Sequence, residues 1–137
     1  MTKPLILIIE DDKDIADLYQ HLLESSKADI EIIRTGEDAM SRLATTVPSI
    51  VLLDLKLFPH LSGTEILLHI RSQQRLAKTR VIVLTGHPSM VEPVKDYADW
   101  ILIKPIDIGE LQDIVARLLS NEARKTLNAT APTNKGP

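Results

Sequence analysis

Ile50-Val51-Leu52-Leu53-Asp54 is a short apolar run that ends on a carboxylate. Four apolar residues in a row, two of them β-branched, are typical of a strand that is buried on both faces of a sheet. The residues that follow, Leu55 to His60, have the character of a loop. Ligands of an open parallel sheet bind outside the carboxyl ends of its strands, so Asp54 is predicted to lie at the functional edge.

Four other segments have the character of strands. Leu5–Ile9 is also wholly apolar, which predicts a second central strand, whereas the alternation that opens Ile30–Ile33 is more typical of an edge strand. The fourth and fifth predicted strands are Arg80–Leu84 and Trp100–Ile103. Apolar residues at helical spacing predict four helices between and after these strands, each opened by a capping residue: Asp12 or Asp14, Thr35, Ser62 and Asp107.

The alternation of strands and helices predicts an α/β fold, namely a doubly wound, five-stranded parallel sheet with helices on both faces. The two wholly apolar strands should both be central, which fits the flavodoxin-like strand order 2-1-3-4-5. At 137 residues, the chain is expected to form one domain over residues 1–120. From Asn121 the apolar pattern ends, and residues 121–137 have the composition of a linker or a disordered tail.

Composition excludes several classes of protein. The absence of cysteine excludes a disulfide scaffold and thiolate metal sites, and the four histidines lack the spacing of metal ligands. A net charge of −3 without a basic run gives no sign of a nucleic-acid surface. The longest apolar run, Leu5–Ile9, is too short to span a membrane, and Lys3-Pro4 ahead of it does not have the form of a signal peptide. We therefore expect a cytoplasmic protein with no nucleic-acid or membrane partner.

Polar residues stand where the predicted strands end. Glu10 and Asp11 follow the first strand and Asp54 ends the third, so the predicted strand order brings three carboxylates together. Carboxylates at close range repel one another unless a positive charge lies among them, and Mg²⁺ accepts one or two of them together with water and phosphate. Thr85 and Lys104 follow the next two strands, where a hydroxyl and an ammonium group can hold a phosphoryl group. The set predicts phosphoryl chemistry on a carboxylate nucleophile, although Glu10 and Asp11 taken alone could merely cap a helix.

Four motifs occur in order, each at a predicted strand end: Ile8-Ile9-Glu10-Asp11-Asp12, Leu52-Leu53-Asp54-Leu55, Val83-Leu84-Thr85-Gly86 and Ile103-Lys104-Pro105. Together they resemble the response regulator receiver domain of two-component signalling. The resemblance spans about Leu5 to Ser120, which is nearly all of the patterned chain. Each motif alone is weak, but the four in this order are specific.

The resemblance implies that Asp54 is the phosphoacceptor of a phosphorelay and forms an acyl phosphate. It implies Mg²⁺ as the cofactor, bound by Asp11, Asp54 and the backbone carbonyl of Lys56, with Glu10 acting largely through water. The phosphodonor would be a sensor histidine kinase or a phosphotransfer protein, and the downstream partner would be a protein that the sequence does not identify. A domain of this kind is a signalling switch and not an enzyme.

The resemblance also assigns roles on the other side of the site. Thr85 would bond a phosphate oxygen, and Lys104 would pair with the phosphoryl group. Pro105 would follow a cis peptide bond that aims the lysine into the site. His87 lies two residues beyond Thr85, a position that in this family borders the path of the hydrolytic water.

The sequence departs from the family's usual pattern in the region that follows Thr85. Receivers usually carry Tyr or Phe three residues before the lysine, where this chain has Ile101, and the neighbouring Trp100 should face the opposite side of the strand. The span between Thr85 and the lysine is about one helical turn short and contains Pro88 and Pro93. We therefore expect a short or irregular fourth helix and an altered output surface.

Two other functions remain open at this stage. One is an adaptor that keeps the receiver fold but binds a partner without being phosphorylated, which the missing aromatic residue slightly favours. The other is a phosphatase that resembles the haloacid dehalogenases, in which the nucleophile ends the first strand instead of the third.

The sequence also departs from the usual receiver pattern in the loop between Asp54 and Gly63, which contains one extra residue.

Overall fold

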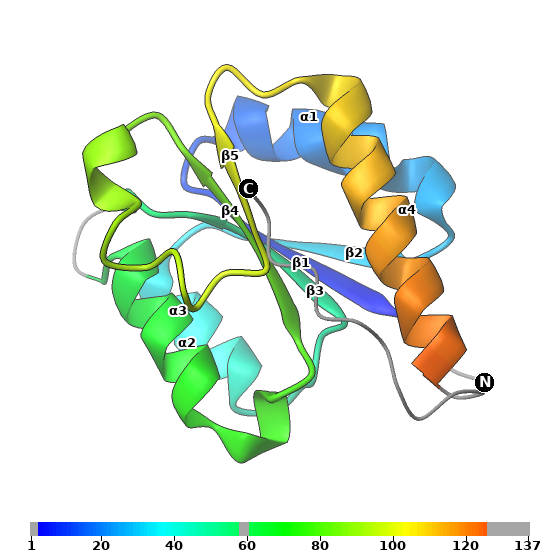
Figure 1. Ribbon diagram of the computed structural model, residues 1–137, viewed down its shortest axis with the longest axis horizontal. Helices are drawn as coiled ribbons and strands as arrows, with labels where there is room; N and C mark the ends of the chain where they lie inside the picture. Colours follow the sequence, from blue (N-terminus) through cyan, green and yellow to red (C-terminus); the bar gives the residue numbers. More distant parts are fainter. Residues whose placement is uncertain (1–2, 58–60, 126–137) are drawn as a thin grey trace.

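The computed structural model describes residues 3–57 and 61–125. A five-stranded parallel sheet in the order β2-β1-β3-β4-β5 forms the centre of the molecule (Figure 1). The strands are β1 (Leu5–Ile9), β2 (Asp29–Ile33), β3 (Ile50–Asp54), β4 (Arg80–Thr85) and β5 (Trp100–Ile103). The predicted fold class and strand order are confirmed, and the edge position of β2 matches its alternating sequence.

Helices cover both faces of this sheet (Figure 1). The longer ones are α1 (Lys13–Leu23), α2 (Gly36–Leu43), α3 (Gly63–Ser72) and α4 (Ile108–Lys125), and three 3₁₀ segments are η1 (Glu24–Ser26), η2 (Gln74–Leu76) and η3 (Pro88–Met90). α1 and α4 pack on one face, while α2 and α3 pack on the other. Side-chain oxygens cap the helices at the predicted positions, and for α1 the structure selects Asp12: the caps are Asp12, Thr35, Ser62 and Asp107.

Two hydrophobic cores lie on opposite sides of the sheet. Val51 and Leu53 of β3 join the core beneath α2 and α3, whereas Ile50 and Leu52 join the core beneath α1 and α4. All five residues of β3 are buried, which explains why this strand is apolar without alternation. Burying a side chain of this size stabilises the fold by about 1.5–3 kcal/mol, so the central strands fix the sheet and with it the position of Asp54.

The segment between β4 and β5 contains no regular helix. It consists of η3, which Pro88 opens, and a series of turns up to Tyr97, as the two prolines predicted. Val94 is buried beneath these turns. The guanidinium of Arg71 on α3 holds the end of the segment, because it donates to Tyr97 O (2.7 Å) and to Asp99 Oδ2 (2.7 Å). Burial of Val94 and the ion pair between Arg71 and Asp99 thus help to fix the segment.

Several details differ from the sequence pattern or lie outside the described residues. α4 continues to Lys125, beyond the last residue of the apolar pattern. Leu18 and Ile108, which fit the apolar faces of their helices, are each 47% exposed. Of the predicted linker or tail over residues 121–137, residues 121–125 belong to α4, and residues 126–137 lie outside the described residues. Residues 58–60 of the loop with the extra residue also lie outside the described residues.

Candidate functional site

Three acidic residues meet at the carboxyl ends of β1 and β3. Glu10 and Asp11 directly follow β1, and Asp54 ends β3, the strand beside it. One carboxylate oxygen from each residue lies within 4.8 Å of the others. Glu10 and Asp54 are almost entirely buried, at 2% and 7% exposure. The structure therefore brings together the three carboxylates that the strand order predicted.

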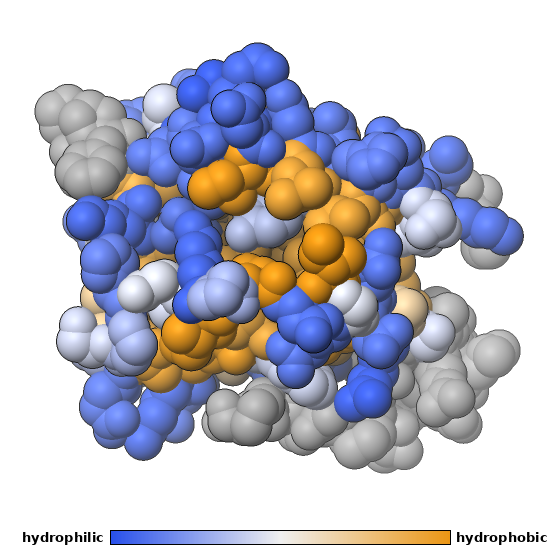
Figure 2. Space-filling view, turned by 90° about the horizontal axis from the view of Figure 1, so that it is seen from above, coloured by the Kyte–Doolittle hydropathy of each residue, from blue (hydrophilic) through white to orange (hydrophobic). Residues whose placement is uncertain are grey.

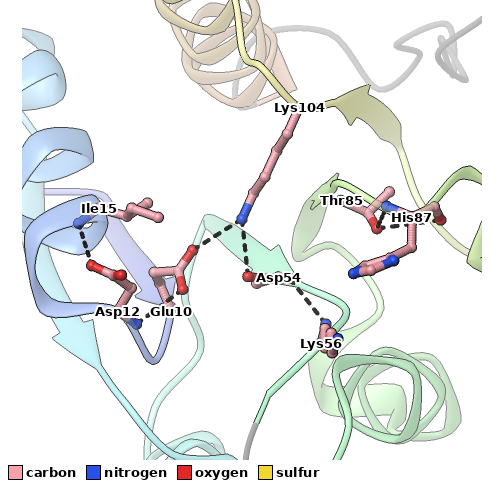
Figure 3. A network of polar contacts seen from close by, with 8 residues as sticks. All are labelled: Glu10, Asp12, Ile15, Asp54, Lys56, Thr85, His87 and Lys104. Carbon is pink, nitrogen blue, oxygen red and sulfur yellow. Dashed lines mark hydrogen bonds and ion pairs between the residues drawn. The ribbon is translucent and has the colours of Figure 1, made fainter.

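Lys104 reaches these acids from the far side of β4 (Figure 3). Its Nζ lies 3.1 Å from Asp54 Oδ2 and 3.5 Å from Glu10 Oε1. Its backbone N–H donates to Thr85 O (2.8 Å), and the bond to Pro105 is cis, as expected. Burial opposes the charged form, but the attraction and hydrogen bond of Asp54 still raise the pKa of Lys104. The ammonium is therefore a permanent positive charge beside the acids.

Glu10 is the acid whose protonation is most strongly altered. Burial raises its pKa from 4.5 to about 7, and the charge of Asp54 acts in the same direction. A hydrogen bond from Asp12 N (3.1 Å) and the charge of Lys104 oppose this effect without cancelling it. Burial beside another acid thus makes the charged form of Glu10 unfavourable, and Lys104 alone does not offset this effect.

Asp54 is oriented by the backbone that follows it. The N–H of Lys56 donates to Asp54 Oδ1 (2.9 Å), which leaves Oδ2 to Lys104. The returning chain approaches closely at Gly63, where an added Cβ would lie 2.1 Å from Asp54 O. The N–H of Gly63 also donates to Leu55 O (2.9 Å). Only glycine fits this approach, so Gly63 helps to fix the loop beside the carboxylate.

Thr85 ends β4 and is fully buried. Its hydroxyl oxygen accepts a hydrogen bond from His87 N (3.0 Å), and the contact from the hydroxyl to His87 O is longer, at 3.5 Å (Figure 3). A hydroxyl has one proton and two lone pairs. The short bond uses a lone pair, so the proton is held only by the long contact and can turn to another acceptor.

The donor set fits a hard divalent cation. Glu10, Asp11 and Asp54 offer only oxygen atoms, which is what Mg²⁺ prefers, and their mutual repulsion would be relieved by such a charge. Asp12, next in the chain, has another task, because its carboxylate caps α1 by accepting from Ile15 N (3.0 Å). Sequence reasoning did not identify Arg34, which donates to the backbone oxygen of Asp11, since such a contact leaves no pattern in the sequence.

An apolar groove with a volume of about 230 Å³ lies beside the acidic cluster, between α1 and the start of α4. Figure 2 shows hydrophobic surface around a hollow on this side of the molecule. Leu18 and Ile108 line the groove and are half exposed, while Tyr19 is buried in it. Lys104 also lines the groove, so one side chain belongs both to this surface and to the charged site.

None of the helices in the described part of the chain has both the length and the apolar character needed to span a bilayer.

Comparison with known proteins places these features in one family. The family model of the response regulator receiver domain matches residues 6–116. The response regulator ArlR of Staphylococcus saprophyticus is 33% identical over 130 residues, a match that covers 93% of this chain and 56% of ArlR. This chain thus spans about half the length of that relative.

Solved structures agree with the sequence comparison. The signal receiver domain of a LuxO repressor protein from Vibrio parahaemolyticus superposes with a TM-score of 0.81 at 30% identity, covering 91% of this chain and 96% of that one. The receiver domain of a DNA-binding response regulator from Colwellia psychrerythraea gives a TM-score of 0.78 at 32% identity, and the match covers 85% of this chain and 98% of that one. The chain belongs to the response regulator receiver domain family of two-component signalling.

Proposed function

We propose that this receiver domain is a Mg²⁺-dependent phosphoacceptor that carries the phosphoryl group on Asp54. The observation that supports it best is the position of this buried carboxylate, which lies together with two further acids and forms an ion pair with Lys104. Glu10, Asp11 and Asp54, with the backbone carbonyl of Lys56, are the groups that would hold the cation. When bound, Mg²⁺ would offset the negative charge shared by the carboxylate and the incoming phosphoryl oxygens.

The transfer is a nucleophilic substitution at phosphorus. One oxygen of Asp54 forms the new O–P bond while the bond from phosphorus to the donor breaks, and the donor leaves with that electron pair. With acetyl phosphate the leaving group is acetate, and the product is an acyl phosphate on Asp54. Lys104 would move its ion pair from the carboxylate to a phosphoryl oxygen, and Thr85 would turn its proton toward another. The domain accepts the group and is not a turnover enzyme.

The phosphodonor in this proposal is a sensor histidine kinase or a phosphotransfer protein. Such a partner must bring its phosphoryl group to Asp54 and therefore needs surface next to this residue. The groove between α1 and α4 supplies apolar surface that adjoins the site through Lys104. We propose that the donor protein contacts this groove, with the half-exposed Leu18 as its main apolar contact.

The test is incubation of the full chain with acetyl phosphate and Mg²⁺, read by intact mass. The wild type should gain one phosphoryl group, and the gain should vanish in Asp54→Asn and when EDTA removes the metal. Ser62→Asn, in a helix cap outside the acidic cluster, serves as the matched control and should label normally. A folded wild type whose mass does not change would favour the adaptor, a function that the aliphatic Ile101 at the usual aromatic position also favours.

A further inference from the structure

The peptide group between Asp11 and Asp12 is held at both of its polar atoms by side chains. Its N–H, on Asp12, donates to Glu10 Oε2 (3.1 Å). Its carbonyl oxygen, on Asp11, accepts from Arg34 Nη2 (2.9 Å) and Arg34 Nε (3.3 Å). A carboxyl oxygen therefore faces the positive end of this peptide dipole and a cation faces the negative end, which fixes the orientation of the peptide plane.

Strand pairing fixes the point from which Arg34 reaches this peptide. Arg34 directly follows β2, which pairs with β1 through Ile9 and Ile33. The N–H of Glu10 extends the pairing by one residue, because it donates to Ile33 O (3.0 Å). The backbone is thus fixed at the ends of both β1 and β2, and the side chain of Arg34 reaches from one strand end to the Asp11 carbonyl at the other.

The orientation of this peptide constrains the backbone at Asp11, from which the carboxylate projects. Rotation of the peptide changes ψ of Asp11, and Asp11 contributes one of the three carboxylates in the cluster. Two N–H groups of a planar guanidinium restrain the carbonyl in direction as well as in distance. A lysine ammonium keeps the charge but cannot reproduce this fork.

We propose that Arg34 is a positioning residue for the Mg²⁺ site, acting through the backbone carbonyl of Asp11. This inference rests on the proposed function, since it assumes that Asp11 binds the metal. Arg34 does not touch the reacting atoms. Its two hydrogen bonds hold the backbone between Glu10 and Asp12 in the arrangement that places the Asp11 carboxylate with Glu10 and Asp54.

If Arg34 acted only through its charge, its removal would have the opposite effect on the affinity for Mg²⁺. The guanidinium is a positive charge next to a site for a divalent cation, so through Coulomb repulsion its removal should strengthen Mg²⁺ binding. Positioning predicts that its removal weakens binding. The sign of the effect in Arg34→Ala therefore separates the two roles, and Arg34→Lys isolates the geometric part because the charge stays.

The experiment is a calorimetric Mg²⁺ titration of the full chain as wild type, Arg34→Lys, Arg34→Ala and Arg42→Ala. Arg42 of α2 is the matched control, since it pairs with Glu31 of β2, the strand that Arg34 follows, and Glu31 is not one of the clustered acids. Loss of an outer partner of a metal ligand weakens metal affinity by about 10- to 100-fold. Because Arg34 is exposed, we expect the lower end, about tenfold, for both Arg34 variants and no change for Arg42→Ala.

A second readout separates positioning from a general loss of structure. The Mg²⁺ concentration for half-maximal labelling by acetyl phosphate should rise about tenfold in Arg34→Lys, while the rate at saturating Mg²⁺ stays within about twofold of the wild type. Arg34→Lys with wild-type affinity, or tighter binding by Arg34→Ala, would overturn the inference and leave the proposed function intact. A wild type that binds no Mg²⁺ and takes up no phosphoryl group would overturn both.

Discussion

Lys104 Nζ lies 3.1 Å from Asp54 Oδ2, although the strands β5 and β3 that bring these two residues to the site are separated in the sheet by β4. The long lysine side chain crosses the end of β4 and places a positive charge against two buried acids. This ion pair is the main charge compensation of the acidic cluster when no metal is bound. The stability of the metal-free protein should therefore depend on Lys104 and on Glu10, the second acid that it contacts, in opposite directions.

Lys104→Met should destabilise the metal-free protein. Removal of one partner leaves buried acids uncompensated, which costs about 3–5 kcal/mol for a fully buried pair and less here, about 1–3 kcal/mol, because Lys104 is partly exposed. Mg²⁺ should restore more of the free energy of unfolding in the variant than it adds to the wild type, since it replaces the lost charge. Urea unfolding with EDTA and with Mg²⁺ measures both effects. An equal loss under the two conditions would contradict this account.

Glu10→Gln should instead stabilise the metal-free protein. The folded state raises the pKa of Glu10 from 4.5 to about 7, so between these pH values the folded protein binds more protons at this group than the unfolded chain does. The contribution of Glu10 to stability therefore falls as pH rises from about 4.5 to 7. Gln keeps an oxygen for the N–H of Asp12 and carries no charge.

The variant should be more stable than the wild type by about 1–3 kcal/mol at pH 8 and about equal to it near pH 4, since one pKa unit corresponds to about 1.4 kcal/mol. Unfolding in urea with EDTA, repeated across this pH range, measures the difference. A difference that is independent of pH would mean that Glu10 ionises normally in the folded protein.

Asp11→Ala and Asp12→Ala should separate metal binding from helix capping. Asp11 contributes a carboxylate to the cluster, whereas Asp12 accepts a hydrogen bond from Ile15 N at the start of α1. We expect Asp11→Ala to abolish Mg²⁺ binding in calorimetry. Asp12→Ala should bind Mg²⁺ normally and lose about 1 kcal/mol of stability through the missing cap. The reverse ranking would mean that the roles of the two neighbours are exchanged.

The sequence predicted the sheet because the signals for it are local. The wholly apolar Leu5–Ile9 and Ile50–Leu53 indicated central strands, and hydroxyl or carboxylate groups ahead of apolar helical patterns marked the caps. The acidic cluster followed from the strand order alone, because parallel strands bring their carboxyl ends to one edge. Proline positions likewise predicted the irregular segment before β5.

The contacts that could not be predicted are those between side chains and distant backbone. Arg34 donates to Asp11 O across 23 residues, and Arg71 donates to Tyr97 O across 26 residues. Neither arginine follows a periodic pattern, and exposed arginines are common on any surface. The half-exposed Leu18 has the same spacing as core residues on α1, so only packing reveals that it lines the groove.

Thr85→Val and Thr85→Ser should differ in their response to a phosphoryl mimic. The hydroxyl accepts from His87 N at 3.0 Å and holds its proton only by a 3.5 Å contact, so a phosphoryl oxygen can take the proton at small cost. In the wild type and in Thr85→Ser, beryllofluoride with Mg²⁺ should change amide exchange at His87.

Thr85→Val keeps the shape of the side chain but has no hydroxyl, so this response should disappear. The initial rate of labelling by acetyl phosphate should fall no more than about tenfold, since Asp54 and the other charged groups remain. Stability should fall by about 1 kcal/mol from the lost acceptor of the His87 N–H. A valine variant that responds as the wild type does would show that the hydroxyl takes no part in the response.

Beryllofluoride should not drive tight symmetric dimers through the surface formed by the segment before β5, β5 itself and α4. By resemblance, common receivers use this surface for output, with a regular helix before the last strand and an aromatic residue on that strand. Here turns replace the helix, and Ile101 packs against the core beneath α2 and α3 with no hydroxyl to change partners. A ligand shifts a conformational equilibrium only by its different affinity for the two states, so coupling to this surface should be weak. Light scattering with and without beryllofluoride should show the same mass, and amide exchange should show no new protection between Val94 and Leu118. A tight dimer that forms on activation and protects these residues would contradict the prediction and assign output to this surface after all.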